Sequence, residues 1–335
     1  MLCGDRTAVG VDLQVDAHGR CPTVDRKVDG YNSVADCRLP TADSDSDSTP
    51  MLLERFRTYL AFVRFSHTVF ALPFALVGAL LASRLVPMTS GRVAWIVAAM
   101  VAARSAAMAF NRLVDARYDA LNPRTAQREI PRGAMSVREA TSFLVVASLA
   151  FLVVCAQISR LCLLLAPVAL GIVFWYSWAK RVTWATQFFL GLAMAVAPVG
   201  GWIASGGGLS WQPVLLAVAI GTWVGGFDVL YACQDLDFDR AHGLRSIPVR
   251  FGVPRSIAIS RALHVVTVAS LAALGVVAGL GVVYQGGVGL VAALLLFEQS
   301  LVSATDLSQV KRAFDMNGWV GLLYLATTGL SIYVS

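Results

Sequence analysis

Long apolar segments recur along the chain from about Leu60 onward, and they constrain the fold more than any other feature of the sequence. Each is close to the ~20 residues that an α-helix needs to cross the hydrocarbon core of a bilayer. Hydrophobic residues make up 57% of the chain and charged residues 14%, whereas a soluble domain averages about 45–50% apolar residues. The sequence therefore predicts an all-α membrane protein with several spans.

The apolar segments define nine candidate transmembrane helices, which we expect to form a bundle. Basic residues near their ends predict the orientation, because Lys and Arg are enriched in cytoplasmic loops. With the N-terminus in the cytoplasm, eighteen of these basic residues lie inside and three lie outside, and an odd number of spans places the C-terminus outside. The expected spans are 60–83, 93–112, 140–157, 161–178, 184–204, 212–232, 257–280, 282–302 and 317–334.

The first 50 residues differ in composition from the rest of the chain. They hold nine of its 21 acidic residues and no apolar run long enough for a signal peptide. Such a segment buries too little surface to offset the entropy lost on ordering. We expect residues 1–50 to be a disordered tail or the product of a mis-called start codon, and residues 51–335 to form a single domain. The cysteines show neither metal-ligand spacing nor a disulfide pattern.

Two short segments hold half of the twelve acidic residues beyond the first 50, each at the predicted cytoplasmic end of a span. Asn111, Asp115 and Asp119 follow one another at i, i+4 and i+8, so they would stack on one face of a helix. We call them the first ladder. Asp235 and Asp239 repeat the spacing and are called the second ladder.

The ladders have the chemistry of a metal site. Like charges at a membrane boundary repel one another and lose hydration, so they need a strong counter-charge. Carboxylate and amide oxygens suit Mg²⁺, which also bridges to substrate phosphates. The alternative is that Asp115 and Asp119 neutralise arginines of a solvated loop, but two ladders with one spacing favour metal binding. Asp228 lies seven residues before Asp235, two helical turns deeper on the same face.

The residues around the ladders resemble the UbiA family of intramembrane prenyltransferases, over essentially all of residues 51–335. The ladders match the family signatures N-x-x-x-D-x-x-x-D and Y-x-x-x-D-x-x-x-D, the second beginning at Tyr231. Other matches follow in the family's order. They are Arg104, the R-T-A-x-R-x-x-P-x-G loop at 124–133, the Y-x-x-x-K-R element at 176–181 and the G-x-x-S…FG stretch at 243–252.

The resemblance implies a multi-pass enzyme of the cell inner membrane that transfers a polyprenyl group from its diphosphate to an aromatic ring. Departure of the diphosphate would leave an allylic cation, shielded from water by a wall of Phe, Trp and Met. The implied Mg²⁺ ligands are Asn111, Asp115, Asp119, Asp235 and Asp239. The four aspartates among them and Asp228 are the candidate catalytic residues. The general base that removes the ring proton is either Asp228 or Asp237. The implied diphosphate-binding residues are Arg64, Arg104, Arg124, Arg128, Tyr176 and Lys180.

The acceptor is left open between 4-hydroxybenzoate and a dihydroxynaphthoate, that is, between ubiquinone and menaquinone biosynthesis. Arg112 stands where many ubiquinone-pathway members carry Asp, and the local sequence is more similar to the menaquinone futalosine branch. Arg112 would then seat an acceptor carboxylate, or else be a solvated loop residue. Haem, chlorophyllide or archaeal-type lipid prenylation are alternatives, and a membrane transporter is a further one. No nucleic-acid partner is expected.

Overall fold

The nine expected spans correspond to nine long helices in the computed structural model, which describes residues 55, 57–63 and 65–334, and the side chains of these residues apart from 65–70. The interpretation of residues 1–50 therefore lies outside the described residues. No β-strand occurs in the described part, so the all-helical prediction is confirmed there. The long helices are α2 (Phe65–Ser83), α3 (Ser90–Leu121), α4 (Val137–Ile158), α5 (Arg160–Val182), α6 (Thr186–Ala204), α7 (Trp211–Ala232), α10 (Val253–Val277), α11 (Val282–Ser300) and α12 (Val310–Val334).

Seven of these helices are long and apolar enough to cross a membrane: α3, α4, α5, α6, α7 with its continuation, α10 and α11. In α2, the shorter stretch Ala71–Ser83 is apolar. Helix α12 carries two basic residues and an acidic one in its first two turns, namely Lys311, Arg312 and Asp315. The chain is a multi-pass membrane protein, while the count of nine spans and the positions of the termini remain predictions.

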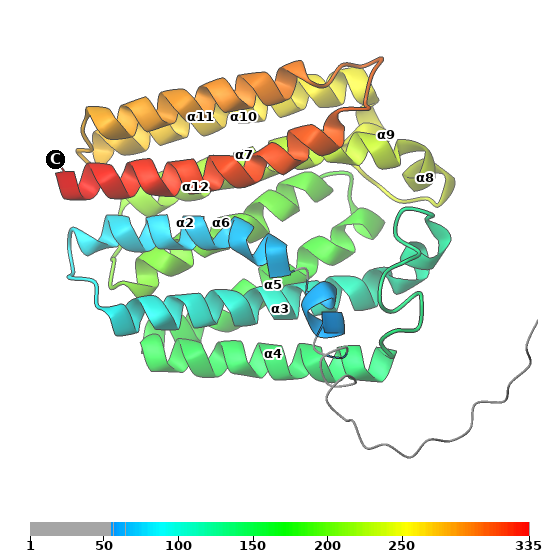
Figure 1. The fold of residues 1–335 in the computed structure, drawn as a ribbon, viewed down its shortest axis with the longest axis horizontal. Coiled ribbons are helices and arrows are strands. Elements are labelled where there is room, and N and C mark those ends of the chain that lie inside the picture. Colours follow the sequence, from blue (N-terminus) through cyan, green and yellow to red (C-terminus); the bar gives the residue numbers. More distant parts are fainter. Residues whose placement is uncertain (1–54, 56, 64, 335) are drawn as a thin grey trace, which may run out of the picture. The chain divides into compact units, whose positions relative to one another are not determined.

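The helices lie side by side, with α2 and α6 between two groups (Figure 1). Helix α6 packs against α2, α5 and α7, while α3 packs against α4 and α5. On the other side, α10 packs against α7 and α11, and α12 packs against α11 and α2. Ser159 alone links α4 to α5, and its hydroxyl accepts from the Cys162 amide at 3.1 Å, so the tight hairpin expected between these spans is present.

The helix of the first ladder is longer than predicted, whereas the helix before the second ladder ends where it was expected. Helix α3 continues to Leu121, beyond its expected end at residue 112, so the whole first ladder lies on one α-helix. Helix α7 ends at Ala232 and is followed by a 3₁₀ turn, η1 (Cys233–Asp235), and by the short helix α8 (Leu236–Ala241). Asp228 and the second ladder therefore do not share one regular α-helix, as their seven-residue spacing implied, because the tighter turn intervenes before Asp235.

The loop between α3 and α4 is fixed at both ends. The backbone amide of Asn122 donates to the Tyr118 carbonyl where α3 ends. At the start of α4, Ser136 and Glu139 form a capping box, in which each side chain accepts from the other residue's backbone amide. This loop and α8 lie at the same end of the bundle, together with α9 (Ile247–Phe251) (Figure 1).

Glycines allow α6 to approach its neighbours at backbone distance. A Cβ atom at Gly201 would overlap the carbonyl oxygen of Ala75 on α2, and one at Gly191 would overlap the carbonyl oxygen of Gly221 on α7. Small residues of this kind let helices pack closely where no hydrophobic effect drives their association. Helices α2, α6 and α7 therefore form a closely packed unit beside the ladders.

Replacing Gly201 by alanine should destabilise the protein by roughly 1–3 kcal/mol, because the added methyl group meets backbone that cannot rotate away. Gly200→Ala is the matched control, since it adds the same atom at the preceding position of α6, where nothing lies within 4 Å. The control should be neutral or stabilise by up to about 1 kcal/mol. Denaturant unfolding in detergent would measure both, and equal stabilities of the two variants would contradict the close packing.

Candidate functional site

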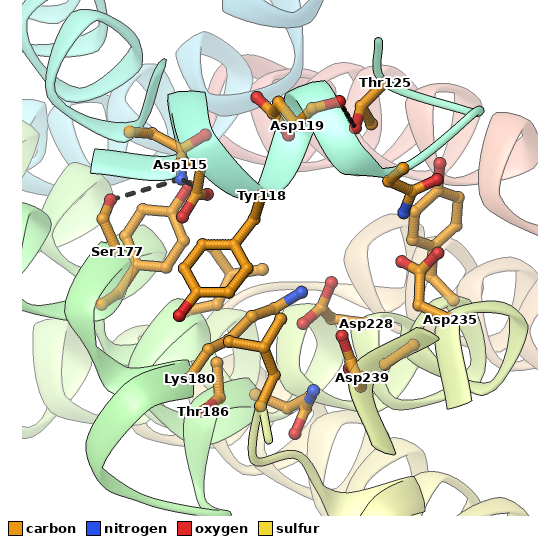
Figure 2. A pocket seen from close by; sticks show the side chains of 18 of the residues that line it. Asp115, Tyr118, Asp119, Thr125, Ser177, Lys180, Thr186, Asp228, Asp235 and Asp239 are labelled. Carbon is orange, nitrogen blue, oxygen red and sulfur yellow. Dashed lines mark hydrogen bonds between the residues drawn. The ribbon is translucent and has the colours of Figure 1, made fainter. Parts of the chain in front are cut away.

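A cavity of about 280 Å³ lies between the two ladders, and it draws together residues from α3, α5, α6, α7 and α8 and the α3–α4 loop. Figure 2 shows carboxylates of both ladders facing this space, with side chains of α5 between them. Arg64, the remaining predicted site residue, lies outside the described residues. The eleven predicted residues that line the cavity are Arg104, Asn111, Asp115, Asp119, Arg124, Arg128, Tyr176, Lys180, Asp228, Asp235 and Asp239.

In the first ladder, both oxygens of Asp115 accept hydrogen bonds. Its Oδ1 accepts from Arg181 Nη2 at 2.9 Å, and its Oδ2 accepts from Asn111 Nδ2 at 3.0 Å. The same Asn111 nitrogen lies 3.4 Å from Ser177 Oγ on α5. Because the amide nitrogen of Asn111 is used in this way, its carbonyl oxygen is the group that a cation could use.

Asp119, the last residue of the first ladder, is buried and pairs with an arginine of the α3–α4 loop. Arg128 Nη1 donates to its two carboxylate oxygens at 2.8 and 2.7 Å. The hydroxyl of Thr125 also donates to the backbone carbonyl of Asp119 at 3.2 Å. The loop is thereby held against the end of α3.

The second ladder is joined to the same loop by Arg124. Its Nε and Nη2 donate to the two carboxylate oxygens of Asp235 at 3.2 and 2.8 Å, which is the fork geometry that arginine favours. Its Nη1 donates to the Tyr231 hydroxyl at 3.1 Å. A loop that follows the first ladder thus reaches across the cavity to the second.

Lys180 extends from α5 toward the carboxylates of Asp228 and Asp239 (Figure 2). The charges of both carboxylates interact with the Lys180 ammonium group. Asp239 is 1% exposed, and its Oδ2 is buried with no hydrogen-bond partner among the described residues. Leaving a buried carboxylate oxygen unpaired is costly, so this atom marks a place where a cation or a hydrogen-bond donor would be stabilised.

The donor set fits a hard divalent cation, although the carboxylates are now paired with guanidinium groups. No three His, Cys, Asp or Glu side chains of the described residues converge as a metal site. Asp115, Asp119 and Asp235 instead point at Arg181, Arg128 and Arg124. Carboxylate oxygens on both sides of the cavity and the Asn111 amide oxygen on one side are ligands that Mg²⁺ prefers. Within the described part of the chain, Asp239 Oδ2 has no hydrogen-bond partner that would compete with a cation.

An apolar cavity of about 380 Å³ adjoins the polar one. Helices α2 to α6 line it, mostly with Ala, Val, Leu and Ile side chains. The two cavities meet at residues that line both of them, namely Arg104, Tyr176, Leu190 and Met194. A ligand with an anionic head and a long apolar tail would match this combination of surfaces.

Some residues are placed differently from the sequence-based interpretation. Asp237, the second candidate for the base, is exposed and is not among the residues that line the cavity. Arg112 does line it, but is 3% exposed and lies 3.9 Å from Glu129, so it is no solvated loop residue. The expected apolar wall contains Phe and Met but no Trp among the described residues; its members include Met108, Met194, Phe227 and Phe314.

Sequence reasoning missed several polar residues that line the cavity, among them Tyr118, Ser177, Thr186 and Gln187. A helical signal was present for two of them. Tyr118 follows Asp115 by three residues, and Ser177 precedes Lys180 by three, which is the spacing of neighbours on one helix face. Thr186 and Gln187 begin α6 and carry no such signal.

Known proteins are similar to this chain in both sequence and fold. A sequence profile of the UbiA prenyltransferase family matches residues 71–321. The 4-hydroxybenzoate octaprenyltransferase of Vibrio parahaemolyticus is 34% identical over 221 residues, which cover 66% of this chain and 77% of that protein. The enzyme of the same name from Cronobacter sakazakii is 31% identical over 242 residues, covering 71% of this chain and 83% of that protein.

Solved structures give the same result. A UbiA homolog from Aeropyrum pernix K1, solved in its apo form, is 35% identical with a TM-score of 0.72, covering 78% of this chain and 96% of that one. A UbiA homolog from Archaeoglobus fulgidus bound to GPP and Mg²⁺ has the same fold, with a TM-score of 0.67 at 20% identity over 82% of this chain and 99% of that one. Together with the family match over most of the chain, these likenesses show that the chain belongs to the UbiA prenyltransferase family and is a prenyltransferase.

Proposed function

We propose that this enzyme transfers a polyprenyl group from polyprenyl diphosphate to an aromatic carboxylic acid, in a reaction that depends on Mg²⁺. The observation that carries the proposal is the polar cavity between two carboxylate ladders, which continues into an apolar one. Residues 51–335 would form the single catalytic domain. The Archaeoglobus fulgidus homolog, which holds GPP and Mg²⁺, supports the same pairing of ligands here.

The polar cavity would hold the diphosphate. The two ladders would bind Mg²⁺, with Asp115, Asp119, Asp235 and Asp239 as carboxylate ligands and Asn111 as an amide ligand. When bound, Mg²⁺ would neutralise the diphosphate and stabilise it as a leaving group. The cationic donors to the remaining phosphate oxygens would be Arg104, Arg124, Arg128 and Lys180, with the Tyr176 hydroxyl beside them and Arg64 as a further candidate.

Diphosphate binding requires Arg124 and Arg128 to leave Asp235 and Asp119, with which they pair in this structure. Both guanidinium groups would then bind phosphate oxygens, while the freed carboxylates would bind the metal. Exchange of one anion for another keeps each arginine paired throughout, which avoids leaving a buried charge uncompensated.

The apolar cavity would hold the polyprenyl chain. Its walls are apolar, and it starts beside Arg104 and Tyr176, where the diphosphate would end. This arrangement directs the first isoprene unit toward the junction of the two cavities. Met194 and Leu190 line that junction and would exclude water from the allylic carbon.

At the junction, the aromatic ring would attack the allylic carbon as the bond to the diphosphate breaks. Phe227 and Phe314 lie in the cavity wall with ring centroids 5.4 Å apart, and their faces would stabilise the allylic cation. The ring carbon that forms the new bond would then lose its proton and regain aromaticity. Asp228 is the proposed acceptor of this proton, since it lines the cavity beside Lys180 and Asp237 does not.

The relatives support 4-hydroxybenzoate as the acceptor, because the curated proteins compared above carry that substrate in their names. A dihydroxynaphthoate is the second candidate, on the observation that Arg112 follows Asn111 and lines the cavity. In either case, Arg112 would seat the acceptor's carboxylate in competition with Glu129. Haem, chlorophyllide and archaeal-type lipids lack this combination of a small aromatic ring and a carboxylate.

The proposed orientation places the ladders at the cytoplasmic leaflet of the cell inner membrane. Basic residues of the α3–α4 loop and of α8 and α9 lie at the ladder end of the bundle (Figure 1). Near the opposite end, Arg84 donates to the carbonyl of Ala278, and Arg92 to the carbonyl of Ser205 at 3.1 Å. The enrichment of basic residues on the cytoplasmic side supports this assignment.

An assay of the purified full chain with labelled polyprenyl diphosphate tests the proposal. Both 4-hydroxybenzoate and dihydroxynaphthoate would be offered with Mg²⁺, and products identified by mass. Phenol, which lacks the carboxylate, should have a lower kcat/KM than 4-hydroxybenzoate by the equivalent of about 1–3 kcal/mol. EDTA should stop transfer, and added Mg²⁺ should restore it.

Each outcome of this assay decides one part of the proposal. The acid with the higher kcat/KM identifies the acceptor. Equal rates for phenol and 4-hydroxybenzoate would refute recognition of the carboxylate. Transfer that continues in EDTA would refute the requirement for a metal, and with it the role assigned to the ladders.

A further inference from the structure

Arg181 lies behind the first ladder and is not among the residues that line the cavity. It is the second-to-last residue of α5, and its side chain is 20% exposed. Its Nη2 donates to Asp115 Oδ1 and to the Val114 carbonyl, both at 2.9 Å. Its Nη1 donates to the Ser177 carbonyl at 2.8 Å. One guanidinium group therefore ties the backbone of two helices to a ladder carboxylate.

The guanidinium group also lies over two aromatic rings. Its central carbon lies 5.1 Å from the centroid of Tyr118 and 6.0 Å from that of Trp178. Such contacts restrict the side chain, which would otherwise have several rotatable bonds. Arg181 is thus positioned before any ligand binds.

By fixing Asp115, Arg181 also fixes the side chain of Asn111. Since Arg181 holds Oδ1 of Asp115, Oδ2 is presented to the Asn111 amide nitrogen at 3.0 Å. That nitrogen is also near Ser177 Oγ, on the same helix as Arg181. Two of the three residues of the first ladder are therefore oriented from α5.

We propose that Arg181 is a positioning residue, which orients Asp115 and Asn111 for the metal ion without contacting substrate. The inference depends on the proposed function, since it concerns the metal that the ladders would hold. Hydrogen-bonded partners behind metal ligands typically contribute about 10–100-fold to metal affinity. Lysine cannot replace the arginine fully, because an ammonium group lacks the planar fork that reaches three acceptors.

Calorimetric titration of Mg²⁺ into the purified full chain provides a readout independent of turnover. Inorganic diphosphate is present at one concentration throughout, so that it engages Arg124 and Arg128 and frees the carboxylates of Asp235 and Asp119. Arg181→Gln should weaken Mg²⁺ binding by about 10–100-fold, and Arg181→Lys should weaken it less. In the transfer assay, the Mg²⁺ concentration for half-maximal rate should rise by a similar factor. At saturating Mg²⁺, kcat should stay within about threefold of wild type, because a high concentration of Mg²⁺ still occupies the weakened site.

Arg245→Gln is the matched control. This exposed arginine lies at the same end of α5, and its side chain donates to the Val182 carbonyl, which is not part of either ladder. Its loss should leave Mg²⁺ binding unchanged. If Arg181→Gln fails to fold, Arg181→Lys, which retains the charge, decides the question.

Whether Mg²⁺ binding weakens or tightens in the Arg181 variants distinguishes a positioning role from an effect of the positive charge alone. If Arg181 acted only by its positive charge, its removal would reduce repulsion of the cation and tighten Mg²⁺ binding. Tighter or unchanged Mg²⁺ binding in folded Arg181 variants would overturn the inference. Failure of EDTA to stop wild-type transfer would instead overturn the proposed function, so the two failures are distinguishable.

Discussion

Alanine at Asp235 should reduce prenyl transfer by at least about a thousandfold, which corresponds to roughly 4 kcal/mol of lost transition-state stabilisation. Asp235 is the residue of the second ladder that faces Arg124, and the proposed function makes it a ligand of the metal on the leaving diphosphate. Asp115→Ala, in the first ladder, should have an effect of the same order. A single-turnover assay with labelled polyprenyl diphosphate would measure both.

Loss of stability should not account for the effect of Asp235→Ala. The Arg124 side chain is 41% exposed and the Asp235 side chain 12% exposed, so water can hydrate the guanidinium group once the carboxylate is removed. Asp237→Ala is the control, because Asp237 is exposed two residues along the chain and outside the cavity. The control should retain activity, whereas more than about a tenth of wild-type activity in Asp235→Ala would exclude the two-ladder mechanism.

Lys180→Met should reduce kcat by about 10²–10³-fold, because the ammonium group is a preorganised cationic donor to the departing diphosphate. Methionine keeps the approximate length of the side chain and removes the charge. Lys180→Arg should recover part of the rate, since it restores a cation at a shifted position. Rates at saturating acceptor and Mg²⁺ would be compared with wild type.

Lys311→Met makes the same chemical change on the exposed start of α12, and it should leave the rate unaltered. Gel filtration and thermal unfolding of the variants would show whether Asp228 and Asp239 still allow folding without the amine. A folded Lys180→Met enzyme with near wild-type kcat would exclude direct action of Lys180 on the diphosphate.

The sequence predicted the helices and the first ladder well because both depend on local spacing. The apolar runs of about 20 residues located each long helix, although α3 and α12 extend further than expected. The four-residue spacing grouped Asn111, Asp115 and Asp119 on one face of α3. The eleven described residues chosen for the site line one cavity. Their roles as ligands and donors remain predictions.

What the sequence could not provide depends on packing between distant segments. The four-residue spacing of Asp235 and Asp239 did not reveal the 3₁₀ turn at the end of α7, because the aspartates face the cavity on either backbone. The spacing also could not separate Asp228 from Asp237, since the direction in which each side chain points is set by neighbouring helices. Arg181 ends the Y-x-x-x-K-R match but received no role from the sequence, and only its contact with Asp115 on α3 relates it to the ladder.

The α3–α4 loop should tolerate fewer changes in length than its position at the bundle end suggests. Loops usually tolerate insertions and deletions better than the helices they connect. Here Arg124 and Arg128 contact opposite ladders, and both ends of the loop are fixed by hydrogen bonds. Removing one residue between the two arginines would turn one guanidinium group away from its carboxylate, so changes of length in this loop should be confined to the segment after Arg128.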